Sequence, residues 1–175
     1  MKPISEMSQI EVAAFVQSNL ETRKIHVTLS GGAATSFYSQ NQYVSADIDL
    51  VNEYSVTRKR IDEVMNEIGF SETGRYFIHP ESEYVVEFPP GPLTVGVEPV
   101  KVVEKFELET GILQIISATD CIKDRLAAFY HWGDEQCLYQ ARLVKKVTTV
   151  DLKEIERWSK NEGKEKEFIL FVSKE

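Results

Sequence analysis

The stretch from residue 25 to residue 51, IHVTLSGGAATSFYSQNQYVSADIDLV, restricts the fold of this chain more than any other part. A short β-branched run ends at Ser-Gly-Gly, residues 30–32, and a second apolar run carries Asp47 and Asp49. Both runs predict strands, because apolar and polar residues alternate with the period of two that a strand requires. The intervening AATSFYSQ predicts a helix that begins near Ala33.

Two aspartates stand two residues apart on the second predicted strand. Successive side chains of a strand point to opposite faces, so Asp47 and Asp49 should share one face while Ile48 and Leu50 are buried on the other. Alternate Cα atoms lie roughly 6 to 7 Å apart, at which distance two carboxylates repel each other. A divalent cation bound between them offsets this repulsion. The pair is interpreted as half of a magnesium site, and a solvated strand edge is the alternative.

The Ser-Gly-Gly turn before the predicted helix suits a phosphate. Gly31 and Gly32 have no Cβ, which lets backbone N–H groups approach an anion, and Ser30 adds a hydroxyl donor. The helix expected from Ala33 directs its positive end to the same point. A tight turn without a binding role is the alternative for such a glycine pair.

The order of strand, Ser-Gly-Gly, helix and Ser-x-Asp-x-Asp strand resembles the signature of the nucleotidyltransferase superfamily, which includes DNA polymerase β, the minimal nucleotidyltransferases and the aminoglycoside nucleotidyltransferases. The resemblance covers this motif closely and the first hundred or so residues loosely. It implies that Ser30, Gly31 and Gly32 bind a nucleoside triphosphate. It also implies that Asp47 and Asp49 hold two Mg²⁺ ions, or Mn²⁺ in their place.

In this superfamily a third acid on a neighbouring strand activates the attacking hydroxyl. Glu87 is the candidate, because it ends the alternating run YVVEF just before Pro89 breaks the chain. The resemblance implies that Glu87 acts as the base or as a third metal ligand. The superfamily more often has Asp at this place, and the loop between Gly32 and Asp47 is longer than its usual spacing.

The remainder of the first 116 residues predicts further helices and strands. Antiparallel pairing of two strands joined by the turn Pro-Glu-Ser should bring Glu87 into the sheet near the aspartates. The predicted elements are helices over 3–20 and 57–69, strands over 75–79 and 83–88, and an edge hairpin within 97–117.

From Ser117 onward the periodicity is helical. Three helices are predicted over 117–132, 134–147 and 150–163, and the tail after residue 163 is expected to form a strand or a helical turn. The expected fold class is therefore α/β (α+β), with a small mixed β-sheet nucleotidyltransferase core at 1–116 and a helical bundle at 117–175 packed on it. This bundle resembles the one that follows the catalytic core in several bacterial nucleotidyltransferase-like proteins of unassigned activity.

Three cations in the helical part are expected nearest the triphosphate or its acceptor: Lys123, Arg125 and Arg142. A guanidinium binds phosphate oxygens bidentately, which suits Arg125 in particular. The alternative is a structural ion pair in which Asp124 and Arg125 bridge helices.

The other conspicuous side chains are expected to pack. His131 and Trp132 close a predicted helix, with stacking of Trp132 on a base as the alternative. Cys121 and Cys137 have no zinc-binding spacing and are expected in the core. The basic run at 58–60 is expected on a solvated helix face.

Charge and hydropathy limit the partners. A formal net charge of −8 argues against nonspecific binding to nucleic acid, since that binding depends on neutralising phosphates. No apolar run approaches the roughly 20 residues that span a bilayer, and the sequence MKPISEMSQ lacks the apolar stretch of a signal peptide, so a cytoplasmic protein without a membrane partner is expected. An acidic surface also suits a basic partner protein.

Three functional hypotheses follow. The first is transfer of a nucleoside monophosphate from a nucleoside triphosphate to a hydroxyl on RNA, protein or a small molecule by two-metal chemistry. The second is a catalytically degenerate nucleotidyltransferase-fold binding module, such as a component of a toxin–antitoxin or defence pair. The third is a structural α/β domain. A carboxylate at Glu87 close to the aspartates distinguishes the first from the second.

Overall fold

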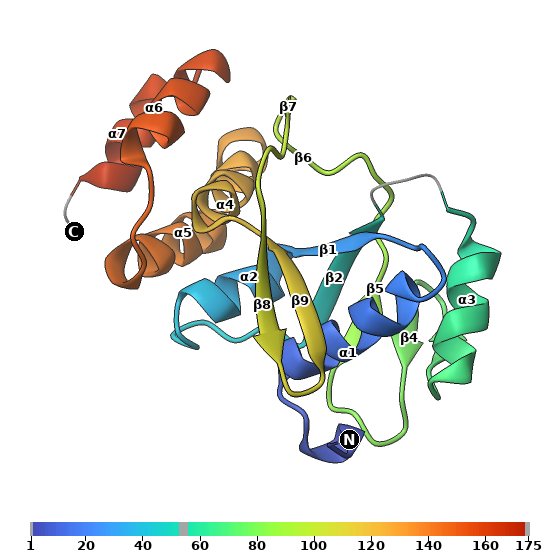
Figure 1. Cartoon of the computed structure of the whole chain (residues 1–175). Helices are drawn as coiled ribbons and strands as arrows, with labels where there is room; N and C mark the ends of the chain where they lie inside the picture. Colours follow the sequence, from blue (N-terminus) through green and yellow to red (C-terminus); the bar gives the residue numbers. More distant parts are fainter. Residues whose placement is uncertain (1, 53–55, 174–175) are drawn as a thin grey trace.

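The computed structural model describes residues 2–52 and 56–173 (Figure 1). In this part of the chain, a mixed sheet has the strand order β3-β4-β5-β2-β1-β9-β8, and β6 pairs with β7 in a separate hairpin. The strands are β1 (Val27–Ser30), β2 (Asp47–Asn52), β3 (Ser71–Thr73), β4 (Tyr76–Ile78), β5 (Val85–Glu87), β6 (Thr94–Val95), β7 (Glu98–Pro99), β8 (Val103–Leu108) and β9 (Gly111–Ile116).

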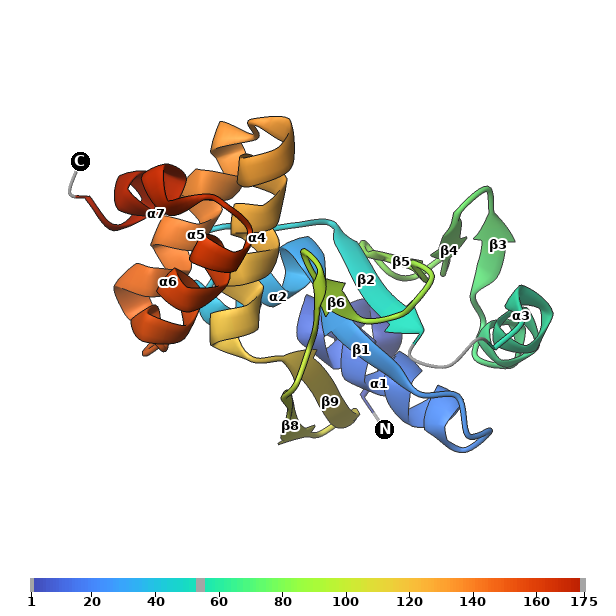
Figure 2. The same ribbon diagram turned by 90° about the horizontal axis from the view of Figure 1, so that it is seen from above.

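Helices cover the sheet and extend beyond it. They are α1 (Gln9–Glu21), α2 (Gly31–Tyr38), α3 (Arg58–Glu67), α4 (Ala118–Trp132), α5 (Glu135–Val147), α6 (Leu152–Asn161) and α7 (Glu165–Val172), preceded by a 3₁₀ turn, η1 (Ile4–Glu6). The α/β class predicted from the sequence, with a mixed sheet, flanking helices and a helical C-terminal part, is confirmed. Both views place α4 to α7 at one end of the molecule and α3 at the other (Figure 2).

The two predicted motif strands lie side by side at the centre of the sheet. β1 pairs antiparallel with β2, with Ser30 opposite Asp49, and parallel with β9 on its other side. Ile48 and Leu50 are fully buried, whereas Asp47 and Asp49 are partly exposed, as the alternation predicts.

The helix after β1 begins at Gly31 instead of near Ala33, and Ser30 is its N-cap residue. Gly31 has φ +66°, a left-handed backbone conformation that a residue with a Cβ adopts with strain. The glycine pair therefore forms the first turn of α2 itself, and α2 packs on β2 and against α4.

Several elements differ from the sequence-based expectation. Residues 4–6 form a separate 3₁₀ turn, and α1 begins at Gln9 with a capping box between Ser8 and Glu11. β3 was not expected, because all its side chains are exposed and no apolar period marks it. The tail forms a helix, α7, which buries Phe171; residues 174 and 175 lie outside the described part.

The C-terminal helices bury their apolar faces in the same cluster as the sheet. Leu126 and Tyr130 of α4 join this cluster, and Trp158 of α6 stacks on Tyr130 with ring centroids 5.5 Å apart. Stacked aromatic rings at this distance stabilise a packed helix pair. Among the described residues, no helix has both the length and the apolar character that crossing a membrane requires.

Candidate nucleotide and metal site

Three carboxylates meet on one face of two neighbouring strands. β5 runs parallel to β2, with Asp47 opposite Val85 and Asp49 opposite Glu87. Because directly opposite residues of adjacent strands project to the same side, Asp47, Asp49 and Glu87 share a face. The structure thus brings together the three acids that the sequence singled out.

Asp49 is the acid most affected by this arrangement. Burial, and next the negative charge of Glu87, raise the pKa of the Asp49 carboxyl to about 6, while the charge of Arg125 acts in the opposite direction. A nearby cation would stabilise the ionised form of a carboxylate in this position.

Gly31 lets Asp49 approach the start of α2. A Cβ built at Gly31 would lie 2.2 Å from Asp49 Oδ2, and one built at Gly32 would lie 2.7 Å from Ser45 Oγ. The space left by the two missing Cβ atoms is therefore taken by Ser45, just before β2, and by Asp49 of β2, whose carboxylate lies against the first turn of α2. Asp49 is held where the backbone of that turn and a bound phosphate would both be within reach.

A cleft of about 360 Å³ connects the glycine turn, Asp49 and α4. Its far wall is the segment from Pro89 to Val100, which contains β6. The residues that line the cleft are Ser30, Gly31, Asp49, Val51, Pro89, Pro90, Pro92, Leu93, Thr94, Val95, Val100, Ile116, Asp124 and Arg125.

Arg125 supplies the positive charge of this cleft. Its Nε lies 3.1 Å from Asp124 Oδ2 and its Nη1 lies 3.4 Å from Gln140 Oε1, so the guanidinium is fixed from two sides. Burial opposes the charge of Arg125, but Asp124 outweighs this effect and raises the pKa of the guanidinium above its ordinary value. Arg125 therefore stays charged where it lines the cleft.

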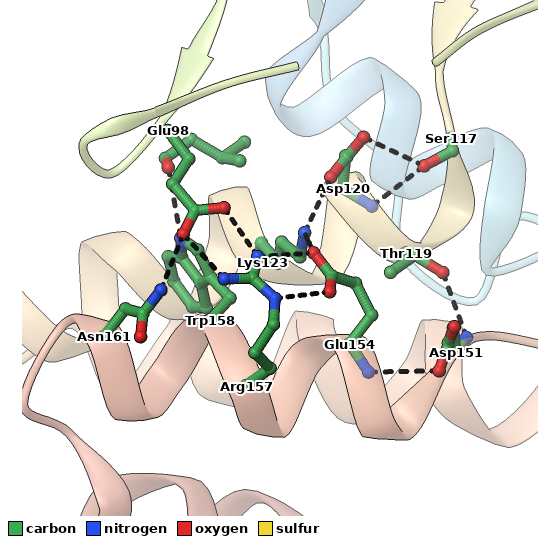
Figure 3. Close-up of polar contacts among 11 residues, drawn as sticks. Glu98, Ser117, Thr119, Asp120, Lys123, Asp151, Glu154, Arg157, Trp158 and Asn161 are labelled. Carbon is green, nitrogen blue, oxygen red and sulfur yellow. Dashed lines mark hydrogen bonds and ion pairs between the residues drawn. The ribbon is translucent and has the colours of Figure 1, made fainter. Parts of the chain in front are cut away.

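The side chain of Lys123 does not line the cleft. Its Nζ lies 2.8 Å from Glu154 Oε1 on α6 and 3.2 Å from Asp120 Oδ1, and the side chain is 5% exposed (Figure 3). The sequence predicts both Lys123 and Arg125 beside the triphosphate, but residues two apart on a helix are about 200° apart around its axis. The structure places Arg125 in the cleft and Lys123 at the interface of α4 with α6.

Arg142 also lies away from the cleft. Its Nη2 donates to the carbonyl oxygen of Leu170, so this arginine connects α5 with α7. The structure therefore does not bring Arg142 to the cleft beside Arg125, where the sequence predicted it.

The Lys123 ion pairs belong to a network that holds the cleft wall (Figure 3). Arg157 of α6 contacts Glu98 of β7 at 2.6 Å and Glu154 at 2.6 Å. Trp158 Nε1 donates to the carbonyl oxygen of Val95 at 3.2 Å. Through these contacts α6 fixes the β6–β7 hairpin that borders the cleft.

Replacing Lys123 by Met is expected to lower the free energy of unfolding by roughly 3 to 5 kcal/mol, because the buried Asp120 then loses its cation, while Glu154 retains its ion pair with Arg157. Urea unfolding measures this loss, and Lys160→Met on the exposed face of α6 is the control. Affinity for ATP in the folded Lys123→Met protein should equal that of the wild type. A weakened affinity would instead place Lys123 at the triphosphate.

Arg75 is a cation near the acids that sequence inspection did not identify. Its Nε lies 3.5 Å from Glu87 Oε2, and its side chain is 67% exposed. The available signal was weak: Arg75 follows Gly74 at the start of a predicted strand, and only the pairing of Tyr76 with Glu87 across β4 and β5 brings the two side chains together.

Trp132 does not pack as expected. Its side chain is 79% exposed, whereas His131 pairs with Glu162 at 3.0 Å. Trp132 lies two residues beyond the buried Tyr130, about 200° around α4, so it cannot share the buried face. Cys121 and Cys137 are buried, as predicted.

A metal ion bound at these carboxylates would need further ligands from the substrate. Within residues 2–52 and 56–173, no group of three or more His, Cys, Asp or Glu side chains is arranged to hold a metal ion by itself. Mg²⁺ is usually bound through one or two carboxylates together with substrate phosphates. The carboxylates around Asp49, whose pKa is raised first by burial and next by the charge of Glu87, fit a cation that takes its remaining ligands from a nucleotide.

The raised pKa of Asp49 predicts a pH dependence in metal-free solution. An Asp carboxyl in an unfolded chain has a pKa of about 3.9, so the folded protein binds this proton more tightly. The contribution of Asp49 to stability is therefore greatest below about pH 4 and falls as the pH rises through about 6, by about 3 kcal/mol in total. Urea unfolding at both ends of this range should show that Asp49→Asn gains stability over the wild type as the pH rises. A difference in the free energy of unfolding between Asp49→Asn and the wild type that stays the same at both pH values would contradict this expectation.

Comparison with known proteins gives a fold but no close relative. No protein-family profile matches the chain, and no curated protein matches it. The solution structure of the antibiotic-resistance factor ANT(2'')-Ia is similar with a TM-score of 0.53 and 13% identity, over 89% of this chain and 91% of that one. The crystal structure of ANT(2'')-Ia with adenylyl-2''-tobramycin gives the same TM-score and identity over 95% of this chain and 100% of that one. The chain therefore has the fold of the polymerase β-like nucleotidyltransferases, to which this aminoglycoside nucleotidyltransferase belongs.

Proposed function

We propose that this protein is a nucleotidyltransferase that moves a nucleoside monophosphate from a nucleoside triphosphate to a hydroxyl group of an acceptor. The observation that carries the proposal is the convergence of Asp49, the glycine turn at Gly31 and the fixed guanidinium of Arg125 on one cleft, with Glu87 beside Asp49. The shared fold with ANT(2'')-Ia supports it.

The polar residues at the cleft and beside it have separate roles in this chemistry. Asp47 and Asp49 would hold two divalent ions, Mg²⁺ or Mn²⁺, which would neutralise the phosphates and stabilise the charge that develops during transfer, and Glu87 would serve as the base or as a third metal ligand. Ser30 and the backbone N–H groups at the start of α2 donate to phosphate oxygens. Arg125 binds phosphate oxygens with its guanidinium.

The transfer step exchanges one phosphate ester bond for another. The acceptor hydroxyl oxygen attacks the α-phosphorus, the bond from that phosphorus to the bridging oxygen of the β-phosphate breaks, and pyrophosphate leaves. Where Glu87 serves as the base, one of its carboxylate oxygens accepts the hydroxyl proton. Because positioning and charge neutralisation supply most of the catalysis in such reactions, the fixed Asp49 and Arg125 matter more than any covalent participation of the protein.

The direct test is isothermal titration of ATP, GTP, CTP and UTP with and without Mg²⁺. We expect nucleotide binding that requires Mg²⁺. The double variant Asp47→Asn with Asp49→Asn should lose this binding. Nucleotide labelled at the α-phosphate then identifies the acceptor among small molecules, proteins and RNA. A folded wild-type protein that binds none of the four nucleotides would refute the proposal for this chain.

One contact favours a second candidate, the catalytically degenerate binding module. Arg75 approaches Glu87 to 3.5 Å, so the proposed base already has a cationic partner. In a toxin–antitoxin or defence pair, such a module would bind nucleotide or a partner protein without transfer. It predicts nucleotide binding with no labelled product in either the wild type or the Arg75→Gln variant, whereas the enzyme predicts transfer by the wild type.

A further inference from the structure

A cavity of about 570 Å³ continues the nucleotide cleft along α4. It shares Asp124 and Arg125 with the cleft, so the two hollows meet at the guanidinium assigned to phosphate. At its other end it is bordered by Val97 at the tip of the β6–β7 hairpin and by Trp132 at the end of α4. A ligand whose phosphates contact Arg125 would therefore lie at the border of the cavity that Trp132 lines.

The spacing along α4 fits the size of a nucleotide. Arg125 and Trp132 are seven residues apart, which places them on the same side of the helix and about 10 Å apart along its axis. The small side chains of Ala127 and Ala128 leave the space between them open. A ribose and one phosphate bridge such a distance, so a base would reach Trp132 while its phosphates remain at Arg125.

The rim of this cavity is fixed by a buried carboxylate. Glu162, whose side chain is 4% exposed, accepts a hydrogen bond from the Val97 backbone N–H at 3.1 Å and lies 3.0 Å from His131 Nε2. Gly96 makes this possible, because a Cβ there would lie 2.4 Å from Glu162 Oε1. The hairpin tip and the end of α4 are thus tied together beside Trp132.

The cavity combines apolar surface with charges that are already paired. Trp132 is 79% exposed and Val97 is 80% exposed, although both are large apolar side chains at the same hollow. Its two carboxylates, Asp124 and Glu162, pair with Arg125 and His131. This chemistry suits an uncharged planar ring better than a polycation.

We propose that the Trp132 cavity binds the base of the nucleoside triphosphate, stacked on the Trp132 indole, while the phosphates occupy the cleft at Arg125 and Gly31. The inference rests on the proposed function, because it requires a nucleotide in that cleft. Stacking of a base on an aromatic side chain changes affinity by roughly 5- to 150-fold and depends little on which base is present. ATP, GTP, CTP and UTP should therefore bind with similar affinities.

Tryptophan fluorescence tests the proposal directly, because the chain has two tryptophans and Trp158 is fully buried. Titrations with ATP and with inorganic tripolyphosphate, both in Mg²⁺, compare a ligand that carries a ring with one that does not. We expect calorimetry to detect binding of both ligands, and only ATP to quench the fluorescence. Trp132→Leu should weaken ATP binding by roughly 5- to 150-fold and leave tripolyphosphate binding unchanged.

Two variants serve as controls. Trp132→Phe retains a stacking face and should keep most of the ATP affinity, and Tyr139→Leu removes a 52% exposed aromatic side chain from α5 and should have no effect. Because Trp132 is exposed, its replacement is not expected to unfold the protein.

The outcomes separate this inference from the proposed function. Equal ATP affinity of the wild type and Trp132→Leu, or quenching by tripolyphosphate as well as by ATP, would overturn the base site while leaving the nucleotide cleft intact. Failure of both ATP and tripolyphosphate to bind the folded wild type would overturn the proposed function, and the base site with it.

Discussion

Replacing Asp49 by Asn is expected to abolish nucleotidyl transfer, with a loss of at least about 1,000-fold in rate. Asp49 lies beside Glu87 on the sheet and against the first turn of α2, where the metal ions and the transferred phosphate would meet. Metal-assisted charge stabilisation contributes several kcal/mol to such a transition state, and each 1.36 kcal/mol corresponds to a tenfold change in rate. The measurement is release of labelled product at saturating nucleotide once the acceptor is known.

Asn has nearly the shape of Asp, so this change tests the charge and not the packing. Asp62→Asn on α3 removes a charge of the same size away from the cleft and should retain full activity. Asp47→Asn should be impaired in the same way, and the double variant should be no worse than either single one if both acids hold a shared metal site. A substantial residual activity in Asp49→Asn would exclude this aspartate as a metal ligand.

Replacing Gly31 by Ala is expected to lower activity by about 100-fold and to weaken Mg²⁺-dependent nucleotide binding. The added Cβ would lie 2.2 Å from Asp49 Oδ2, so the carboxylate must shift by about 1 Å to restore ordinary contact. A displacement of this size at a catalytic group costs about two orders of magnitude in rate. Product release and calorimetry measure the two effects.

Gly163→Ala separates this clash from the strain of the backbone. Gly163 has φ +69°, close to the +66° of Gly31, and a Cβ there meets nothing within 4 Å. Both alanines should therefore cost roughly 1 to 2 kcal/mol of stability from the left-handed conformation, but only Gly31→Ala should lose nucleotide binding. Equal loss of binding in both variants would show that the Gly31 effect arises from general destabilisation.

Local patterns in the sequence were enough to predict the central motif. The alternation of Asp47 and Asp49 with Ile48 and Leu50 predicted correctly which side chains are buried. The helical periodicity was expected from Ser117 onward, and Ser117 is the residue that caps α4, where it accepts a hydrogen bond from the Asp120 backbone N–H. These features depend on neighbours within about four residues, and the periods of strands and helices make such neighbours readable in a sequence.

The partly exposed elements and the edge strand were harder to predict from the sequence. β3 has exposed side chains throughout and is defined by its pairing with β4, so no apolar pattern marked it. The tail was expected as a strand or a helical turn, and it forms α7 because burial of Phe171 against the other helices decides between the two. Propensity is a weak guide where tertiary contacts supply most of the stability.

The two motif strands, the glycine turn and the pair of aspartates could be predicted from the sequence, because they rest on local periodicity and on the chemistry of single residues. Long-range packing places β5 beside β2, which brings Glu87 next to Asp49 and Arg75 close to Glu87. It also decided that Arg125 faces the cleft while Lys123 faces α6. Strand order and the rotation of a helix about its axis are fixed by burial across the whole core, so contacts between distant segments, and not neighbouring residues, select which side chains meet.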